Sequence, residues 1–95
     1  MKKLTYIFST QENADNMYKM MCEMLPMISF NDRFKSIIFY NKFNVKVKFE
    51  FIKGEMHKIL GRDFDEVLLS MDINAEERIR IESYVIARCN KLNYL

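Results

Sequence analysis

Apolar and polar residues alternate most strictly between Phe43 and Ile52. Phenylalanine and valine occupy the odd positions, whereas asparagine, lysine and glutamate occupy the even positions from 44 to 50. This period of two is typical of a β-strand with one buried and one solvated face. Ser36–Tyr40 is a second strand candidate and Asn41-Lys42 a turn, so the two strands are expected to form an antiparallel hairpin.

Two further strand candidates lack this alternation. Lys3–Phe8 is rich in β-branched and aromatic residues, which is typical of a strand buried on both faces. Asp65–Met71 contains a short apolar run and is expected to form the fourth strand. We expect the first and fourth strands to be parallel neighbours, with the hairpin at one side of a mixed sheet.

Two segments have the spacing of an amphipathic helix. The first is predicted to begin at about Thr10, after a capping box made by Ser9 and a glutamate three residues on, and to end before Pro26. The second has Asn74 and another such glutamate as its capping box and is predicted to run to about Lys91. The stretch between the hairpin and the fourth strand is expected to be a connection with one helical turn.

The predicted architecture is therefore one small α/β domain over residues 1–95, in the order β-α-β-β-β-α, with a mixed sheet and two helices. Its expected core draws on every element: Tyr6, Phe8, Met21, Leu25, Ile38, Val45, Val47, Phe49, Val67, Leu69, Ile81, Val85 and Cys89.

Charge is distributed unevenly along the chain, although the net charge is only +2. From Arg33 to Arg62 there are eight lysines and arginines against two glutamates, and from Asp63 to Glu82 seven acids stand against two arginines. The hydrophobic share of 49% and the charged share of 29% indicate a folded protein that is expected to have a basic and an acidic side.

Basic residues near the hairpin are interleaved with aromatic ones, a combination that binds single-stranded nucleic acid by charge and stacking. Within residues 43–52, however, phenylalanines and lysines point to opposite faces, so the aromatic rings are expected in the core. Exposed lysines also discourage aggregation through sheet edges. The candidate nucleic-acid-binding residues are Lys35, Lys42, Lys46, Lys48, Lys53 and Arg62.

The segment Ile59–Ser70, ILGRDFDEVLLS, resembles the approach to the Walker B strand in P-loop ATPases of the phage terminase and helicase type. In that family a leucine-glycine-arginine-x-phenylalanine-aspartate run leads into four apolar residues and an Asp-Glu pair. Thr5–Ala14 is similar to the family's strand-to-helix step after the nucleotide loop. The hairpin is similar to the two strands that precede the Walker B strand in that family. The segment that starts at Asn74 is similar to the helix that lies behind the Walker B strand. The resemblance, with the Lys/Asn/Ile/Met/Phe-rich composition, implies a phage or mobile-element origin.

The chain departs from this family at both places that handle phosphate. No G-x-x-x-x-G-K-[ST] motif occurs, and Ser70 and Met71 stand where the carboxylates should follow the apolar run, with Asp72 two residues late. A hydroxyl and a thioether cannot hold Mg²⁺ as two carboxylates do. The resemblance thus implies a trimmed scaffold without ATP hydrolysis, and chance similarity is the alternative.

The other groups of residues that could bind a metal or catalyse a reaction are incomplete. Asp63, Asp65 and Glu66 offer oxygen ligands, but adjacent strand residues point to opposite sides, so no metal site and no cofactor are expected. His57 is the only histidine, and Cys22 and Cys89 are expected as free thiols on buried helix faces, so a catalytic Cys-His pair is not expected. No catalytic residue is predicted, and the protein is not expected to be an enzyme.

The apolar run after Met1 is too short for a signal peptide, and no stretch approaches the roughly 20 apolar residues of a membrane span. We expect a cytoplasmic protein, in the host cytoplasm if phage-encoded, without membrane contact. The expected function is non-enzymatic binding through protein-protein contact or self-assembly. A nucleic-acid-binding accessory protein with a basic β-hairpin is the alternative, and a degenerate nucleotide-binding domain ranks last.

Overall fold

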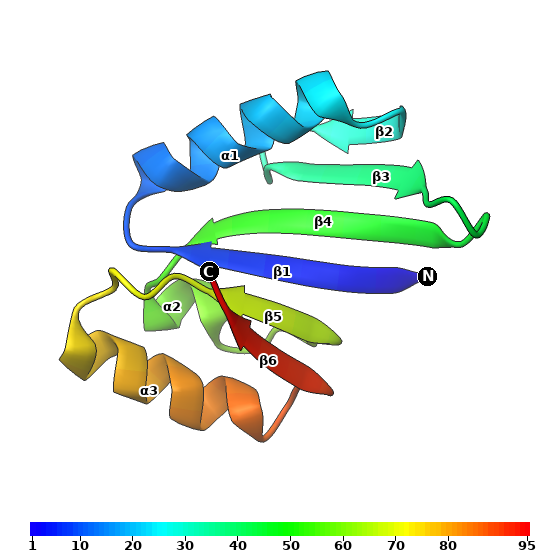
Figure 1. Ribbon diagram of the computed structural model, residues 1–95. Helices are drawn as coiled ribbons and strands as arrows, with labels where there is room; N and C mark the ends of the chain where they lie inside the picture. The colour runs from blue at the N-terminus through cyan, green and yellow to red at the C-terminus, as the bar shows by residue number, and fades with distance from the viewer.

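In the computed structural model, β1 (Lys2–Phe8) lies inside a six-stranded sheet of order β2-β3-β4-β1-β5-β6. The other strands are β2 (Met27–Asn31), β3 (Ser36–Tyr40), β4 (Lys46–Lys53), β5 (Glu66–Leu69) and β6 (Lys91–Tyr94). β1 pairs in parallel with β4 and β5, β5 pairs in parallel with β6, and the β2-β3 and β3-β4 pairs are antiparallel (Figure 1). The structure describes the backbone of residues 1–95 and every side chain except those of Met27 and Ile28.

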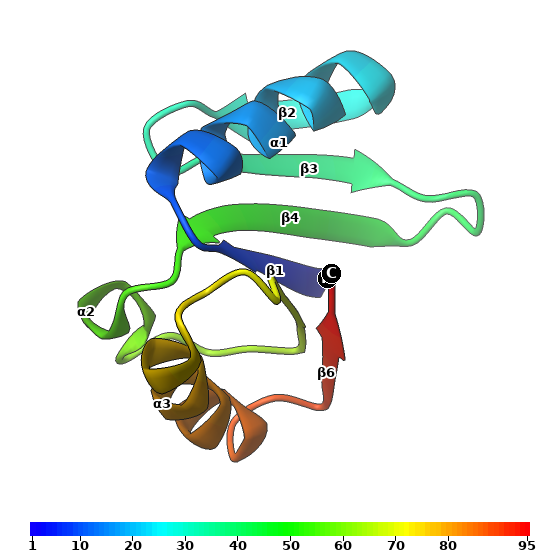
Figure 2. The ribbon, with the colours of Figure 1, turned by 60° about the vertical axis from the view of Figure 1, so that its left-hand side comes forward.

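The helices connect the strands in opposite directions across the sheet. α1 (Gln11–Met24) leads from β1 to β2, whereas α2 (Met56–Ile59) leads from β4 to β5 and α3 (Ala75–Ile86) from β5 to β6. Because crossovers between parallel strands are right-handed, opposite directions place the helices on opposite faces of the sheet. Figures 1 and 2 show α1 beside β3 and β4, and α3 beside β5 and β6.

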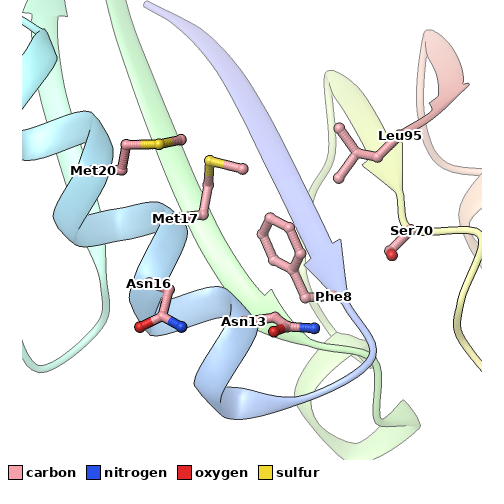
Figure 3. A pocket seen from close by; sticks show the side chains of 7 residues that line it. All are labelled: Phe8, Asn13, Asn16, Met17, Met20, Ser70 and Leu95. Carbon is pink, nitrogen blue, oxygen red and sulfur yellow. The ribbon is translucent and has the colours of Figure 1, made fainter.

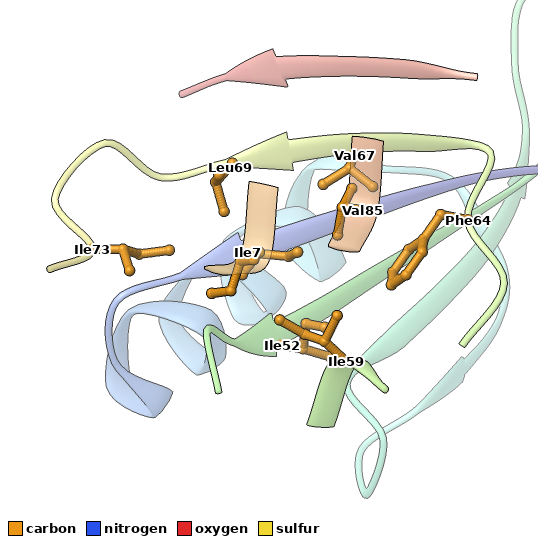
Figure 4. Packing of buried hydrophobic residues seen from close by; sticks show 9 residues of the cluster. Ile7, Ile52, Ile59, Phe64, Val67, Leu69, Ile73 and Val85 are labelled. Carbon is orange, nitrogen blue, oxygen red and sulfur yellow. The ribbon is translucent and has the colours of Figure 1, made fainter. Parts of the chain in front are cut away.

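β1 is buried on both faces along its carboxyl-terminal half, as predicted, and it separates two hydrophobic cores. Tyr6 and Phe8 point toward α1, where they pack with Ala14, Tyr18 and Phe51. The ring centroids of Tyr6 and Phe51 are 5.1 Å apart. The second core lies beneath α2 and α3 (Figure 4) and consists of Ile7, Ile52, Ile59, Phe64, Val67, Leu69, Ile73, Ile81 and Val85.

The structure confirms four of the predictions: the α/β class, the hairpin, the parallel pairing of β1 with β5, and the single helical turn before β5. The order β-α-β-β-β-α is incomplete, because β2 and β6 form the two edges of the sheet. The second helix also ends at Ile86 rather than near Lys91. The backbone N–H groups of Asn90 and Lys91 donate to the carbonyl of Asp65, which brings the last residues alongside β5 as a strand.

One of the two predicted helix caps is wrong. Thr10, not Ser9, caps α1, since its hydroxyl accepts a hydrogen bond from the Asn13 N–H at 3.1 Å. Asn74 caps α3 as predicted, and its side chain accepts from the Glu76 N–H at 3.0 Å. Both side chains satisfy backbone donors that a helix start leaves free.

The alternation of residues 43–52 is only partly used by the sheet. β4 begins at Lys46, and the five residues before it form the turn, in which Asn44 has a positive φ of 61°. The Asn41 carboxamide accepts from the N–H groups of Phe43 and Val45, which holds both apolar side chains in solvent. The predicted burial of Val45 and of Phe43 is therefore wrong.

The rest of the expected core is buried to different degrees. The buried members are Tyr6, Phe8, Val47, Val67, Leu69, Ile81 and Val85. The half-buried members are Met21, Leu25, Ile38, Phe49 and Cys89. Ile38 is half-buried because it points to the face of β3 that lies opposite α1. None of the described helices is long and apolar enough to cross a membrane.

The second core predicts a clear contrast within α3. Ile81 is fully buried, whereas Ile79 is 60% exposed on the same helix. We expect Ile81→Ala to lower the free energy of unfolding by about 2–5 kcal/mol, because it removes buried methyl groups and leaves a cavity. Ile79→Ala, the matched control, should change it by less than about 0.5 kcal/mol. Denaturant unfolding of both variants measures this, and equal losses would contradict the assigned packing of α3.

Candidate nucleic-acid interface

The side of β3 and β4 that points away from α1 carries a positively charged surface. The register places Tyr40 opposite Lys46 across the hairpin, and Lys3 of β1 beside Lys48 of β4. Tyr40 and Lys46 are exposed, and Lys3 and Lys48 are half-exposed. We call this surface, formed by Lys3, Tyr40, Lys46 and Lys48, the open face.

A buried carboxylate lies at one end of the open face. Glu50 is only 7% exposed, although the alternation of the strand predicted a solvated position. Its carboxylate oxygens lie 3.1 Å from Arg62 Nη1, 3.4 Å from Lys48 Nζ and 3.9 Å from Lys3 Nζ. A carboxylate can be buried at this depth because cations compensate for its lost hydration. Three cations against one carboxylate still leave this part of the surface positive.

Arg62 connects this carboxylate to a neighbouring cavity. Its Nε donates to the carbonyl of Lys58 at 2.6 Å, which ties the guanidinium to α2. A small cavity on the open-face side is lined by Asn31, Phe34, Ser36, Lys48, Glu50 and Arg62. Phe34 and Arg62 also line a second cavity, so the two cavities adjoin.

This second cavity, which we call the basic cavity, has a volume of about 210 Å³. Its charged lining residues are all cations, namely Arg33, Lys35, Lys53, Lys58 and Arg62. They come from the β2–β3 turn, the end of β4, α2 and the loop after α2. The remaining lining residues are Gln11, Phe34, Phe51 and Ile52.

Most of the six predicted basic residues belong to these two surfaces. Lys46 and Lys48 lie on the open face, Lys35 and Lys53 line the basic cavity, and Arg62 lies between them. Lys42 lies apart, on the turn between β3 and β4 that extends beyond the neighbouring strands (Figure 2). Its Nζ is 5.2 Å from the centroid of the Phe43 ring.

The structure adds residues that the charge pattern did not single out. Lys3 and Lys58 join the site through strand register and the helical turn, and Arg33 through the β2–β3 turn. The strand phenylalanines do point toward α1, as expected, but Tyr40 and Phe34 are 49% and 61% exposed on the basic side. Aromatic rings and cations therefore do share one side of the sheet.

A different groove lies on the α1 side, between α1 and the carboxyl end of β6 (Figure 3). It has a volume of about 440 Å³ and is lined by Phe8, Asn13, Asn16, Met17, Met20, Ser70 and Leu95. At its edge Asp72 accepts hydrogen bonds from the hydroxyls of Ser70 and of Ser9, the latter at 2.9 Å. These bonds, first that from Ser70, hold the pKa of Asp72 below its usual value.

The remaining candidate ligands and nucleophiles do not converge. Asp65 accepts from the Lys3 backbone N–H and Glu66 pairs with Lys2, and the described residues contain no group of three or more metal-ligating side chains. His57 is exposed and contacts Glu55. Both cysteines are free thiols in different cores; Cys22 lies in α1, but Cys89 lies beyond the end of α3, not on a helix face as expected.

Comparisons with protein-family models, curated proteins and solved structures found no match to this chain. The resemblance of Ile59–Ser70 to the Walker B approach of P-loop ATPases therefore stays a prediction.

The hydrogen bonds to Asp72 predict a pH dependence of stability. Because the pKa of Asp72 is lower in the folded protein than its usual 3.8, its ionised form stabilises the fold above about pH 4, and this contribution is lost as the pH falls through the folded pKa. We expect the free energy of unfolding of Asp72→Asn to fall less steeply with acid than that of the unmodified protein.

Urea unfolding between about pH 5 and pH 2.5 measures this difference. Glu12→Gln is the control, because the Glu12 carboxylate accepts no hydrogen bond in the described structure. Parallel curves for Asp72→Asn and the unmodified protein would show that the two serines do not stabilise the ionised carboxylate.

Proposed function

We propose that this protein is a non-enzymatic accessory protein that binds single-stranded nucleic acid along the open face and the basic cavity. The observation that supports this proposal most strongly is that exposed Tyr40 and Phe34 share one side of the sheet with lysines and arginines. Cations neutralise phosphates, and exposed aromatic rings stack on unpaired bases, which is how single strands are bound without sequence preference.

The charge balance of the site supports a polyanionic ligand. Lys46 has no carboxylate within 4 Å among the described residues, and Lys3, Lys48 and Arg62 share the single carboxylate of Glu50. The surface therefore has positive charge that the protein's own acids do not neutralise. A strand that runs from Tyr40 toward Phe34 would pass these cations in succession.

Single strands suit this surface better than a duplex. The rings of Tyr40 and Phe34 stand on a sheet face and a neighbouring turn, and stacking on them requires bases that are not already paired. A cytoplasmic location and a phage or mobile-element origin, both expected from the sequence, agree with such a role.

Contact with a protein partner, or self-assembly, is the second candidate. The observation in its favour is the groove beside α1, whose walls include Phe8, Met17, Met20 and Leu95. Methionine side chains adapt readily to a partner's surface. Light scattering separates the candidates, because self-assembly requires a solution mass well above the 11.5 kDa of one chain.

The proposed function predicts that neutralising the open face weakens binding. We expect Lys46→Gln/Lys48→Gln to lower affinity for a fluorescent single-stranded oligonucleotide about tenfold in low salt. With two fewer phosphate contacts, the slope of log affinity against log salt concentration should decrease by about 1.4. Fluorescence anisotropy at several salt concentrations measures both quantities.

Lys19→Gln/Lys91→Gln is the matched control, since it removes two exposed cations from α1 and β6 and changes the net charge equally. This control should bind nearly as tightly as the unmodified protein. Equal losses in both double variants would indicate a general charge effect, and no binding by the unmodified protein would refute the proposal.

A further inference from the structure

The basic cavity has more convergent positive charge than an internal phosphodiester requires. Lys53 pairs with Glu55 and Arg62 with Glu50, but both acids lie outside the lining of the cavity. Arg33, Lys35 and Lys58 have no carboxylate partner within 4 Å among the described residues. The cavity thus retains about three uncompensated cations in a volume of about 210 Å³.

Several of these cations are held in place by neighbouring groups. Lys58 Nζ donates to the side-chain oxygen of Gln11 at 2.9 Å, and Arg62 is held through the carbonyl of Lys58. Lys35 Nζ lies 5.3 Å from the centre of the Tyr18 ring, and the Arg33 guanidinium lies 5.4 Å from the centre of the Phe34 ring. Contacts to an amide and to aromatic faces orient these groups and leave their charge available.

We infer that the basic cavity binds the terminal phosphate of a nucleic-acid strand that lies on the open face. This inference rests on the proposed function. A terminal phosphate monoester has a charge near −2 and three free oxygens, whereas an internal phosphodiester has a charge of −1. The uncompensated cations of the cavity match the monoester better.

The walls of the cavity also favour a strand end. The start of α1, the β2–β3 turn, the end of β4, and α2 with the loop after it all contribute lining residues. A strand that runs along the open face from Tyr40 reaches this cavity last, so its terminal phosphate would lie among the lining cations. Phe34 and Arg62, which line both this cavity and the adjoining one, place the basic cavity next to the open face.

The test compares oligonucleotides of one sequence with a 5′-phosphate, a 3′-phosphate or hydroxyls at both ends. We expect one phosphorylated end to be bound about tenfold more tightly than the unphosphorylated strand, since charge-assisted hydrogen bonds contribute on this scale. Arg33→Gln/Lys58→Gln should abolish this preference, so that all three strands are bound with one affinity, which is lower than that of the unmodified protein for the unphosphorylated strand because two cations of the site are lost. That remaining affinity shows that the variant is folded.

Lys46→Gln/Lys48→Gln is the control, because it should weaken binding of all three strands and keep the preference. Equal affinities for the three strands in the unmodified protein would overturn the inference and leave the proposed function standing. No binding of any strand would overturn both. A free nucleoside monophosphate that binds as tightly as the phosphorylated strand would also overturn the inference, because the site would then serve mononucleotides.

Discussion

The pairing of β1 with β4 on one side and β5 on the other is the constraint on which the rest of the structure depends. It joins the hairpin to the segment from β5 to β6, and it requires parallel crossovers that leave β1 and β4 in opposite directions. Right-handed crossovers then place α1 on one face and α2 and α3 on the other. Each face of the sheet is thereby only partly covered, and the uncovered part of β3 and β4 becomes the open face.

Glu50 links this architecture to the candidate site. It lies on β4 opposite Thr5 of β1, and Arg62 reaches it from the loop that leads into β5. These ion contacts therefore join β1, β4 and the loop before β5, which are distant in the sequence and are brought together by the pairing of the sheet. Because the cations outnumber the carboxylate, the same contacts that compensate for a buried charge also concentrate positive charge at the surface. Stability and the proposed anion binding thus depend on one cluster.

Local patterns predicted the elements whose burial follows from their own sequence. β1 was recognisable from its composition, the hairpin and α1 from their periodicity, and the start of α3 from its cap, and all of these signals are local. β2 and β6 were missed because short edge strands form through pairing with a neighbour rather than through their own pattern. Val45 and Phe43 continue the alternation of β4, but the Asn41 side chain bonds the backbone into a turn and exposes both.

The candidate site was predictable in charge but not in geometry. Five of the six basic residues drawn from the sequence lie on the open face or at the basic cavity, because the charge-rich segment supplies both. Lys3 and Arg33 could not be assigned from sequence, since their places depend on the β1–β4 register and on how the β2–β3 turn folds back. The burial of Glu50 has the same origin, because Arg62 approaches it only through tertiary structure.

The central claim is that one side of the sheet binds a single strand, and mapping by amide chemical shifts tests it most directly. In a titration of the isotope-labelled protein with a short single-stranded oligonucleotide, the account predicts shifts concentrated in β3, β4 and residues 33–35 and 58–62. The groove lined by Asn13, Met17 and Ser70 should remain unchanged. Shifts confined to that groove, or spread evenly over the surface, would contradict the account.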